Sequence, residues 1–332
     1  MIEIELEPSP SIPLNALEVL QSEGLLPICV ACGTQYPKTF STDRNCLICE
    51  DPRQAIPATG QEWTNLIELG NNPGEGGENR KHVILKDEED DRISLISCKP
   101  GFAINQTPII IESSEGSYIW DCSAFISLPL IGYLNKLKRP LKGISISHPH
   151  FFTTSLTWSR ALNVPLYLCE DDKEWYQRIS DIKEEDDNII WWRSEKELSK
   201  SVKLIQCGGH FPGSSILYWD RLNEPAPSKD DLPKTQTPVS GIIFTADTLM
   251  VQPTQKNFSF VWSVPNMIPL RPKSIISIQE RLKAISFSQA TSSWPNRWIR
   301  QDAKKALDES VTTFLAAEGW RIDDGKLVEL IT

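Results

Sequence analysis

The sequence predicts an α+β fold in which two sheets pack face to face and helices cover their outer sides. Apolar runs of strand length fall into two clusters along the chain, and helix-length segments lie between and after them. The chain has 332 residues, of which 40% are hydrophobic and 23% charged. This length allows one large domain and a small additional module.

The first cluster begins as a meander with a hairpin turn at residues 113–116. Its predicted strands are Ile93 to Cys98, Pro108 to Glu112, Ser117 to Cys122, Lys142 to Ile146 and Val164 to Cys169. Two helices are expected between these strands, at Leu128 to Lys138 and at Thr153 to Asn163. Upstream, we expect a short helix at Leu14 to Glu23 and a helical run at Trp63 to Leu69.

The second cluster supplies the second sheet. Its predicted strands are Val202 to Cys207, Ser214 to Trp219 and Gly241 to Thr245, and two long helices follow at Pro272 to Ile285 and Gln301 to Glu318. Three polar stretches, residues 70–77, 87–91 and 224–238, have the composition of surface loops.

Four cysteines near the N-terminus form two C-x2-C pairs. Cys29 and Cys32 are separated from Cys46 and Cys49 by 13 residues, close to the spacing of a structural zinc ribbon. Two disulfides or unrelated buried thiols are the competing interpretations. A closed site of four thiolates leaves no open coordination position, so we expect this zinc to support folding rather than chemistry.

Composition limits the partners and the compartment. The net charge of −10 and the pI near 5.1 disfavour nucleic acid and anionic membranes, and between Cys29 and Cys49 only Lys38 and Arg44 are basic. No apolar run reaches the ~20 residues that span a bilayer, and the acidic N-terminus lacks a signal-peptide core. We expect an intracellular protein, in the cytoplasm or the nucleus, with its other four cysteines as buried thiols.

Three of the four histidines stand just after predicted strands. His148 and His150 form an H-x-H pair, His210 lies in a Gly-Gly-His loop, and Asp247 follows a third strand. Three imidazoles and one carboxylate are suited to zinc, iron or manganese. Any one of these histidines taken alone is more simply interpreted as an ordinary surface or core residue, but the set predicts a metal site.

The order of these motifs resembles the metallo-β-lactamase superfamily, and most closely a subgroup with a four-cysteine zinc ribbon before the hydrolase domain. The resemblance covers roughly residues 20 to 320. It implies a four-layer αββα sandwich over residues 61–332, preceded by a module in residues 1–60 that carries the ribbon. His148, His150, His210 and Asp247 would be the ligands of the hydrolase site.

The chain also departs from the superfamily pattern, which reads H-x-H-x-D-H. Phe152 and Thr153 stand at its last two positions, where ligands of a second metal are expected. No histidine follows His210, and residues 292–296 offer no strong replacement for a late ligand. The sequence therefore predicts one ion in the hydrolase-like part and about two ions per chain.

The resemblance implies no particular substrate, and our first hypothesis is a mononuclear hydrolase that attacks an ester, thioester or lactone bond of a small molecule through a metal-bound water. Asp247 is then the candidate catalytic base, because Phe152 replaces the usual carboxylate. Two alternatives remain open: a non-catalytic scaffold that keeps its metal as a cross-link, and an iron dioxygenase acting on a sulfur substrate.

Overall fold

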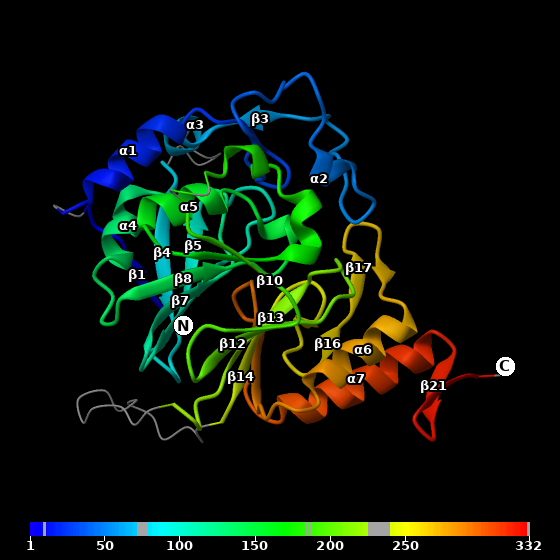
Figure 1. The fold of residues 1–332 in the computed structure, drawn as a ribbon. Helices are drawn as coiled ribbons and strands as arrows, with labels where there is room; N and C mark the ends of the chain where they lie inside the picture. The colour runs from blue at the N-terminus through cyan, green and yellow to red at the C-terminus, as the bar shows by residue number, and fades with distance from the viewer. Residues whose placement is uncertain (9–10, 72–78, 184, 186, 225–239, 331–332) are drawn as a thin grey trace. The chain divides into compact units, whose positions relative to one another are not determined.

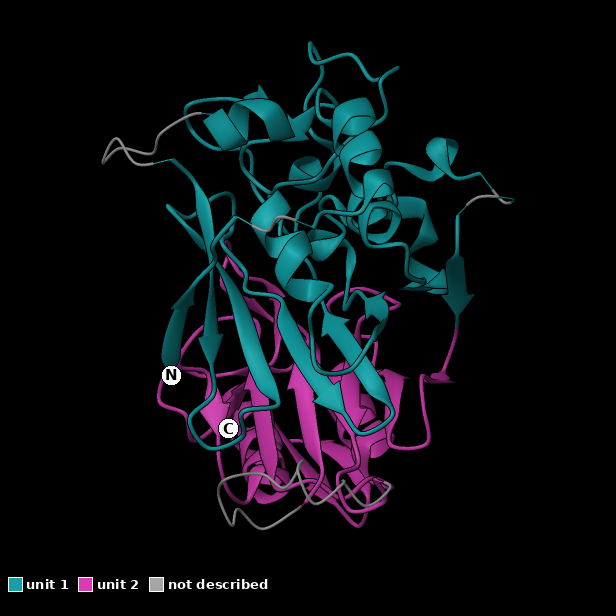
Figure 2. Ribbon diagram, turned by 90° about the vertical axis from the view of Figure 1, so that its left-hand side faces the viewer, with its two compact units in different colours: residues 1–192, 225–237 teal, residues 193–224, 238–332 magenta. Residues whose placement is uncertain are grey.

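The computed structural model describes residues 1–8, 11–71, 79–183, 185, 187–224 and 240–330. The described residues up to Trp192 form unit 1, and those from Arg193 onward form unit 2 (Figure 2). Within the described ranges, no helix combines the length and apolarity that a bilayer crossing requires.

Unit 1 is built on an eight-stranded sheet in the order β1-β4-β5-β6-β7-β8-β9-β10 (Figure 1). The strands are β1 (Ile2–Glu5), β4 (Lys81–Lys86), β5 (Ile93–Lys99), β6 (Ile109–Ser113), β7 (Gly116–Trp120), β8 (Leu141–Ser145), β9 (Leu166–Cys169) and β10 (Ile189–Trp192). Neighbours from β1 to β7 are antiparallel, whereas β7 to β10 are parallel. Parallel neighbours need crossover connections, and helices supply the first two of them.

The crossover helices are α4 (Leu128–Leu134), between β7 and β8, and α5 (Ser155–Leu162), between β8 and β9. The side chain of Ser127 caps α4 by accepting a hydrogen bond from the Leu130 N–H, and α5 ends at Asn163 in the left-handed conformation. Helix α1 (Leu14–Glu23) packs on α5. Residues of β6 and β7 are buried along both strands and form the centre of the sheet.

Unit 2 is built on a six-stranded sheet in the order β11-β12-β13-β14-β19-β20. The strands are β11 (Glu195–Glu197), β12 (Val202–Gln206), β13 (Ser215–Trp219), β14 (Ile242–Thr245), β19 (Gln289–Ser292) and β20 (Trp298–Ile299). Only the β14–β19 pair is parallel, and its connection contains α6 (Pro272–Leu282). Side chains of the sheet, α6 and α7 (Ala303–Ala317) share one apolar core, which includes Ile216, Ile243, Ile278 and Leu307.

Three small hairpins complete unit 2: β15 (Met250–Val251) with β16 (Phe258–Ser259), β17 (Val261–Ser263) with β18 (Ile268–Pro269), and β21 (Trp320–Asp323) with β22 (Lys326–Glu329). Lys304 joins the two long helices, because its Nζ donates hydrogen bonds to the carbonyls of Leu282, Lys283 and Ile285 at 2.6–3.0 Å. The positive charge of this ammonium interacts favourably with the helix dipole at the C-terminal end of α6.

The predicted α+β class with two large sheets is confirmed, and the apolar runs are strands within a few residues of their expected ends. The helical run expected at 63–69 is wrong in its first part: Trp63 and Thr64 form β3, paired with β2 (Ile28–Cys29), and α3 (Leu66–Asn71) starts later. The boundary near residue 60 stays a prediction.

Two of the three predicted surface loops, 70–77 and 224–238, lie mostly outside the described residues. The third, at 87–91, is not simply solvated. Asp87 and Asp90 are buried, the Asp90 N–H donates to Asp87 Oδ2 at 3.1 Å, and Asp90 accepts a bond from Arg92 Nε at 2.8 Å. These carboxylates stabilise the β4–β5 turn.

Candidate metal centres

The four cysteines of the N-terminal module come together. Cys29 ends β2, and Cys46 directly precedes the short helix α2 (Leu47–Glu50), so the β2–β3 pair and α2 bring the two C-x2-C turns face to face. The Sγ atoms lie within 4.8 Å of one another, with Cys29 to Cys49 at 3.7 Å and Cys32 to Cys46 at 3.5 Å. All eight cysteines of the chain are described, and none forms a disulfide.

These sulfur spacings fit one tetrahedral ion. With Zn–S bonds of about 2.3 Å, neighbouring sulfurs of a tetrahedral site lie about 3.8 Å apart. Outer hydrogen bonds also favour thiolates: the Tyr36 hydroxyl donates to Cys46 Sγ at 3.3 Å, and Gln61 Nε2 donates to Cys29 Sγ at 3.3 Å. Hydrogen bonds from the other three cysteines lower the pKa of the Cys29 thiol. The cluster thus has the donor set and spacing of a structural zinc site.

In unit 1, His148 and His150 follow β8 and are both buried. Asp121, which directly follows the neighbouring strand β7, fixes the loop that carries the two histidines. Its Oδ1 accepts a hydrogen bond from the Ser147 N–H at 2.7 Å. Ser147 Oγ and His148 Nδ1 are 2.8 Å apart. The two imidazole rings lie 5.2 Å apart at 75°, which allows both to face one ion.

The side chains of Phe152 and Thr153, which follow the H-x-H pair, pack against other residues of unit 1. The ring of Phe152 packs edge-on against Tyr176, with centroids 5.1 Å apart, and Thr153 Oγ1 lies 2.9 Å from the thiol sulfur of Cys122. Both residues are buried. They contribute to the core of unit 1 in the place where the superfamily pattern has ligands for a second metal.

The cysteine module contacts this same loop. The Gln35 N–H donates to the Thr153 carbonyl at 3.1 Å, and a Cβ on Gly33 would lie 2.6 Å from that of Ala124, so only glycine fits there. The module is therefore joined to the histidine loop through the backbone.

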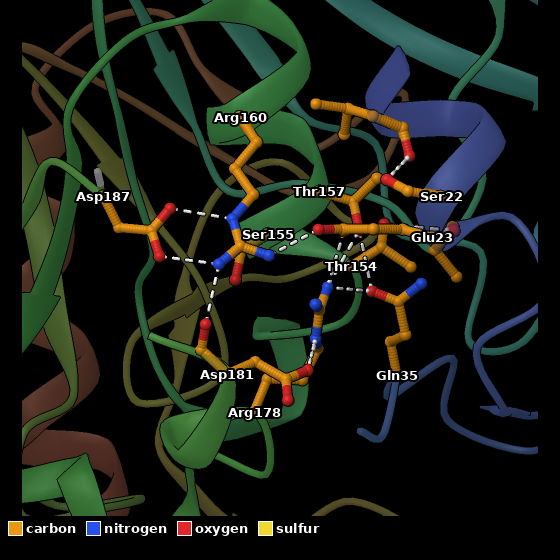
Figure 3. Close-up of polar contacts among 12 residues, drawn as sticks. Ser22, Glu23, Gln35, Thr154, Ser155, Thr157, Arg160, Arg178, Asp181 and Asp187 are labelled. Atoms are coloured by element: carbon orange, nitrogen blue, oxygen red, sulfur yellow. Dashed lines mark hydrogen bonds and ion pairs between the residues drawn. The ribbon is translucent and has the colours of Figure 1, made fainter. Parts of the chain in front are cut away.

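A buried polar network continues from this contact (Figure 3). Arg178 Nη1 donates to Glu23 Oε2 and Gln35 Oε1, both at 2.8 Å, and to Thr157 Oγ1 at 3.0 Å. Arg160 on α5 bonds Asp187 through two nitrogens, at 2.7 and 2.6 Å. The network links α1, the cysteine module and α5, the helix that begins just after the histidine loop.

In unit 2, His210 and Asp247 follow β12 and β14. Gly208 and Gly209 turn the chain with φ of +70° and +88°, and Thr248 Oγ1 closes the turn by donating to the Gly208 carbonyl at 2.5 Å. His210 Nδ1 lies 3.1 Å from the carbonyl oxygen of Val261, and its Nε2 lies 3.7 Å from Asp247 Oδ2. The His210 side chain is fully buried.

The bond to Val261 fixes the tautomer of His210. A carbonyl oxygen only accepts, so Nδ1 carries the proton, and a neutral ring then directs the lone pair of Nε2 toward a carboxylate. Two acceptors facing each other at 3.7 Å are unfavourable unless a proton or a cation lies between them. A proton on Nε2 or a cation held between the two groups would satisfy this half of the predicted site.

The remaining polar residues and thiols have other roles. Ser292 Oγ bonds Thr245 Oγ1 and the Val251 N–H, both at 2.8 Å, so it supports the strand ends. Cys98, Cys122, Cys169 and Cys207 are buried, as predicted. Burial raises the pKa of Cys207 to about 12, which disfavours a catalytic thiolate close to His210.

The sequence did not identify the residues that orient the ligands. Asp121 could have been found as an acidic residue directly after a buried strand. The Val261 carbonyl could not, because a backbone group far along the chain carries no side-chain signal.

Comparison with known proteins shows a clear relative. The chain is 31% identical over 291 residues to the uncharacterized protein YmaE of Bacillus subtilis (strain 168), covering 87% of this chain and 96% of that protein. The chain belongs to the YmaE family. No family model matches it.

Solved structures that this YmaE-family chain is similar to include a metallo-β-lactamase from Pontibacter korlensis (TM-score 0.44, 12% identity) and the DIM-1 metallo-β-lactamase (TM-score 0.46, 13% identity). Each match covers 70% of this chain and 97% of the other.

Proposed function

We propose that this YmaE-family chain is a mononuclear metal-dependent hydrolase in which His148, His150, His210 and Asp247 share one ion, with zinc as the preferred metal. The observation that carries the proposal is the orientation of His210, whose Nδ1 lies 3.1 Å from the Val261 carbonyl oxygen and whose Nε2 lies 3.7 Å from Asp247 Oδ2. Catalytic zinc is usually held by three protein ligands, with water in the open position. The three histidines would therefore bind the ion, and Asp247 would be a weak fourth ligand or the hydrogen-bond acceptor of the bound water.

The hydrogen bond that orients His148 supports its assignment as a metal ligand as well. With Nδ1 of His148 bonded to Ser147 Oγ, its Nε2 is the nitrogen left for a metal. Metal-binding histidines usually bond their second ring nitrogen to the protein in this way, which fixes the ring and raises its basicity. We assign a structural zinc to the four cysteines on the chemistry of their thiolates.

A bound divalent ion would polarise a substrate carbonyl and lower the pKa of water toward ~7. The chain's own residues would do the rest: the histidines orient the reacting centre, and Asp247 takes up the proton of the attacking water. Phe152 supplies no second carboxylate, so Asp247 would have to act as ligand and base, and we expect slow turnover.

The substrate class that suits one Lewis-acidic ion without a second metal is an activated carbonyl: an ester, a thioester or a lactone of a small molecule. The test is hydrolysis of p-nitrophenyl acetate and a simple acyl thioester by the full chain. We expect loss of at least 100-fold in kcat/KM for His148→Ala and for Asp247→Asn, with folding unchanged.

A matched control is His82→Gln, since His82 is buried in unit 1, stacked on Phe125, and outside the ligand set. Equal rates for wild type, His148→Ala and His82→Gln would exclude the hydrolase and favour a scaffold. Native metal content decides the remaining alternative, because iron in place of zinc would favour oxygen chemistry on a sulfur compound.

A further inference from the structure

Thr153 ends the histidine loop, residues 147–153, in a strained conformation. Its φ is +33°, and a β-branched residue keeps a positive φ only where its surroundings hold it. Two groups from outside the loop do so. Cys122 Sγ lies 2.9 Å from Thr153 Oγ1, and the Gln35 N–H donates to the Thr153 carbonyl at 3.1 Å. The loop therefore depends at this point on a residue of the cysteine module.

The conformation of Thr153 is transmitted to both histidines. The carbonyls of His148, Pro149 and Phe152 each accept a hydrogen bond from the N–H three residues later, at 2.9–3.1 Å. These bonds form a continuous series of turns that includes His150 and Thr153. A change of backbone conformation at Thr153 would therefore displace the imidazole rings as well.

Gln35 lies between two residues that contact the cysteine cluster. Thr34 Oγ1 is 3.2 Å from Cys32 Sγ, and the Tyr36 hydroxyl donates to Cys46 Sγ at 3.3 Å. The positions of the sulfur atoms thus determine where the Gln35 N–H lies.

The apolar core of the module is small. Its buried cluster consists of the four cysteines together with Tyr36 and Ile48. A core of this size does not outweigh the loss of chain entropy, and such modules fold through the free energy of metal binding. Loss of the ion should therefore release residues 29–49, and with them the contact between Gln35 and Thr153.

We propose that the ion in the cysteine cluster controls the metal affinity of the histidine site, with Gln35 and Thr153 as the positioning residues that couple the two. This inference rests on the two metal sites of the proposed function. Coupling between two binding sites typically changes affinity by roughly 5- to 150-fold. We expect the histidine site to bind zinc about tenfold more weakly when the cysteine cluster is empty.

The first test is amide hydrogen exchange of the histidine loop in Cys46→Ser. Both this chain and its parent also carry His148→Ala, so that an ion at the histidine site contributes nothing to the result. We expect residues 147–153 to exchange about tenfold faster after Cys46→Ser, while β12 and β13 of unit 2 stay unchanged. The matched control is Val83→Ala, a core position of β4 that should lower the melting temperature without selectively exposing the loop.

The second test leaves all four cysteines in place. Gln35→Pro removes the N–H that binds Thr153, whereas Gln35→Leu loses the same side-chain amide and keeps that N–H. Metal analysis should find the cysteine-bound zinc in both variants. Competition with a chelator should then show about tenfold weaker zinc binding at the histidine site of Gln35→Pro than at that of Gln35→Leu.

Three results would overturn the coupling. They are unchanged exchange of the histidine loop after Cys46→Ser, an equal loss of protection in Val83→Ala, and equal zinc affinities in Gln35→Pro and Gln35→Leu. A wild-type chain that hydrolyses neither ester nor thioester would refute the proposed hydrolase without affecting these comparisons, because they measure loop protection and metal binding.

Discussion

Arg178 is the residue whose removal should destabilise unit 1 most clearly. It is 4% exposed, and its guanidinium contacts Glu23, Gln35, Thr157 and Asp181 at 2.8–3.0 Å. Arg178→Met keeps much of the side-chain volume but removes one of the two arginines that pair with the buried Glu23 carboxylate, the other being Arg160. Breaking a buried pair costs about 3–5 kcal/mol, and because Arg160 stays in place we expect the lower end, about 3 kcal/mol.

For domains of 150–250 residues, roughly 2–4 °C of melting temperature correspond to 1 kcal/mol, so we expect a decrease of about 10 °C. The assay is thermal unfolding followed by circular dichroism at pH 7. The matched control is Lys81→Met, which removes an exposed pair with Glu5 and should change stability by less than about 1 kcal/mol. Equal melting temperatures for the two variants would refute the reasoning.

Three further predictions concern the cysteine cluster, Glu23 and Asp121. Cys46→Ser should remove one zinc equivalent and lower the melting temperature, and metal analysis with calorimetry checks both. Burial opposes ionisation of Glu23, but Arg178, Thr157 and Arg160 together outweigh it and lower the pKa of this carboxyl. The stabilisation is therefore present above about pH 4.3 and lost on further acidification, and acid unfolding of the wild type and of Glu23→Gln measures it. Asp121→Ala should reduce metal affinity about 10- to 100-fold by releasing the Ser147 N–H, as competition with a chelator would measure.

The strands that could be predicted are those whose side chains are buried on both faces. Residues 109–113 and 116–120 are buried throughout, and their apolar runs are unmistakable. The edge strand β1 was missed because its Ile2–Glu5 sequence alternates with glutamates and stays largely exposed. Strand β19 was missed for the opposite reason, since Gln289 and Ser292 are polar residues buried through hydrogen bonds.

The candidate site also contains residues that the sequence identifies and contacts that only the structure shows. Motif spacing identified the four cysteines and the His and Asp residues, because metal ligands need fixed residue types at strand ends and tight turns. The contacts that hold these ligands in place could not be found from motif spacing. The Val261 carbonyl, the Gln35 backbone contact with Thr153 and the apolar packing of Phe152 all depend on tertiary structure.

The measurement that tests the account most directly is the metal content per chain of natively purified protein, with two variants beside it. We predict about two ions in the wild type, one in Cys46→Ser and one in His148→Ala, since Phe152 and Thr153 offer no ligands for a third. Three ions in the wild type, or two ions retained in His148→Ala, would contradict a mononuclear site that depends on His148.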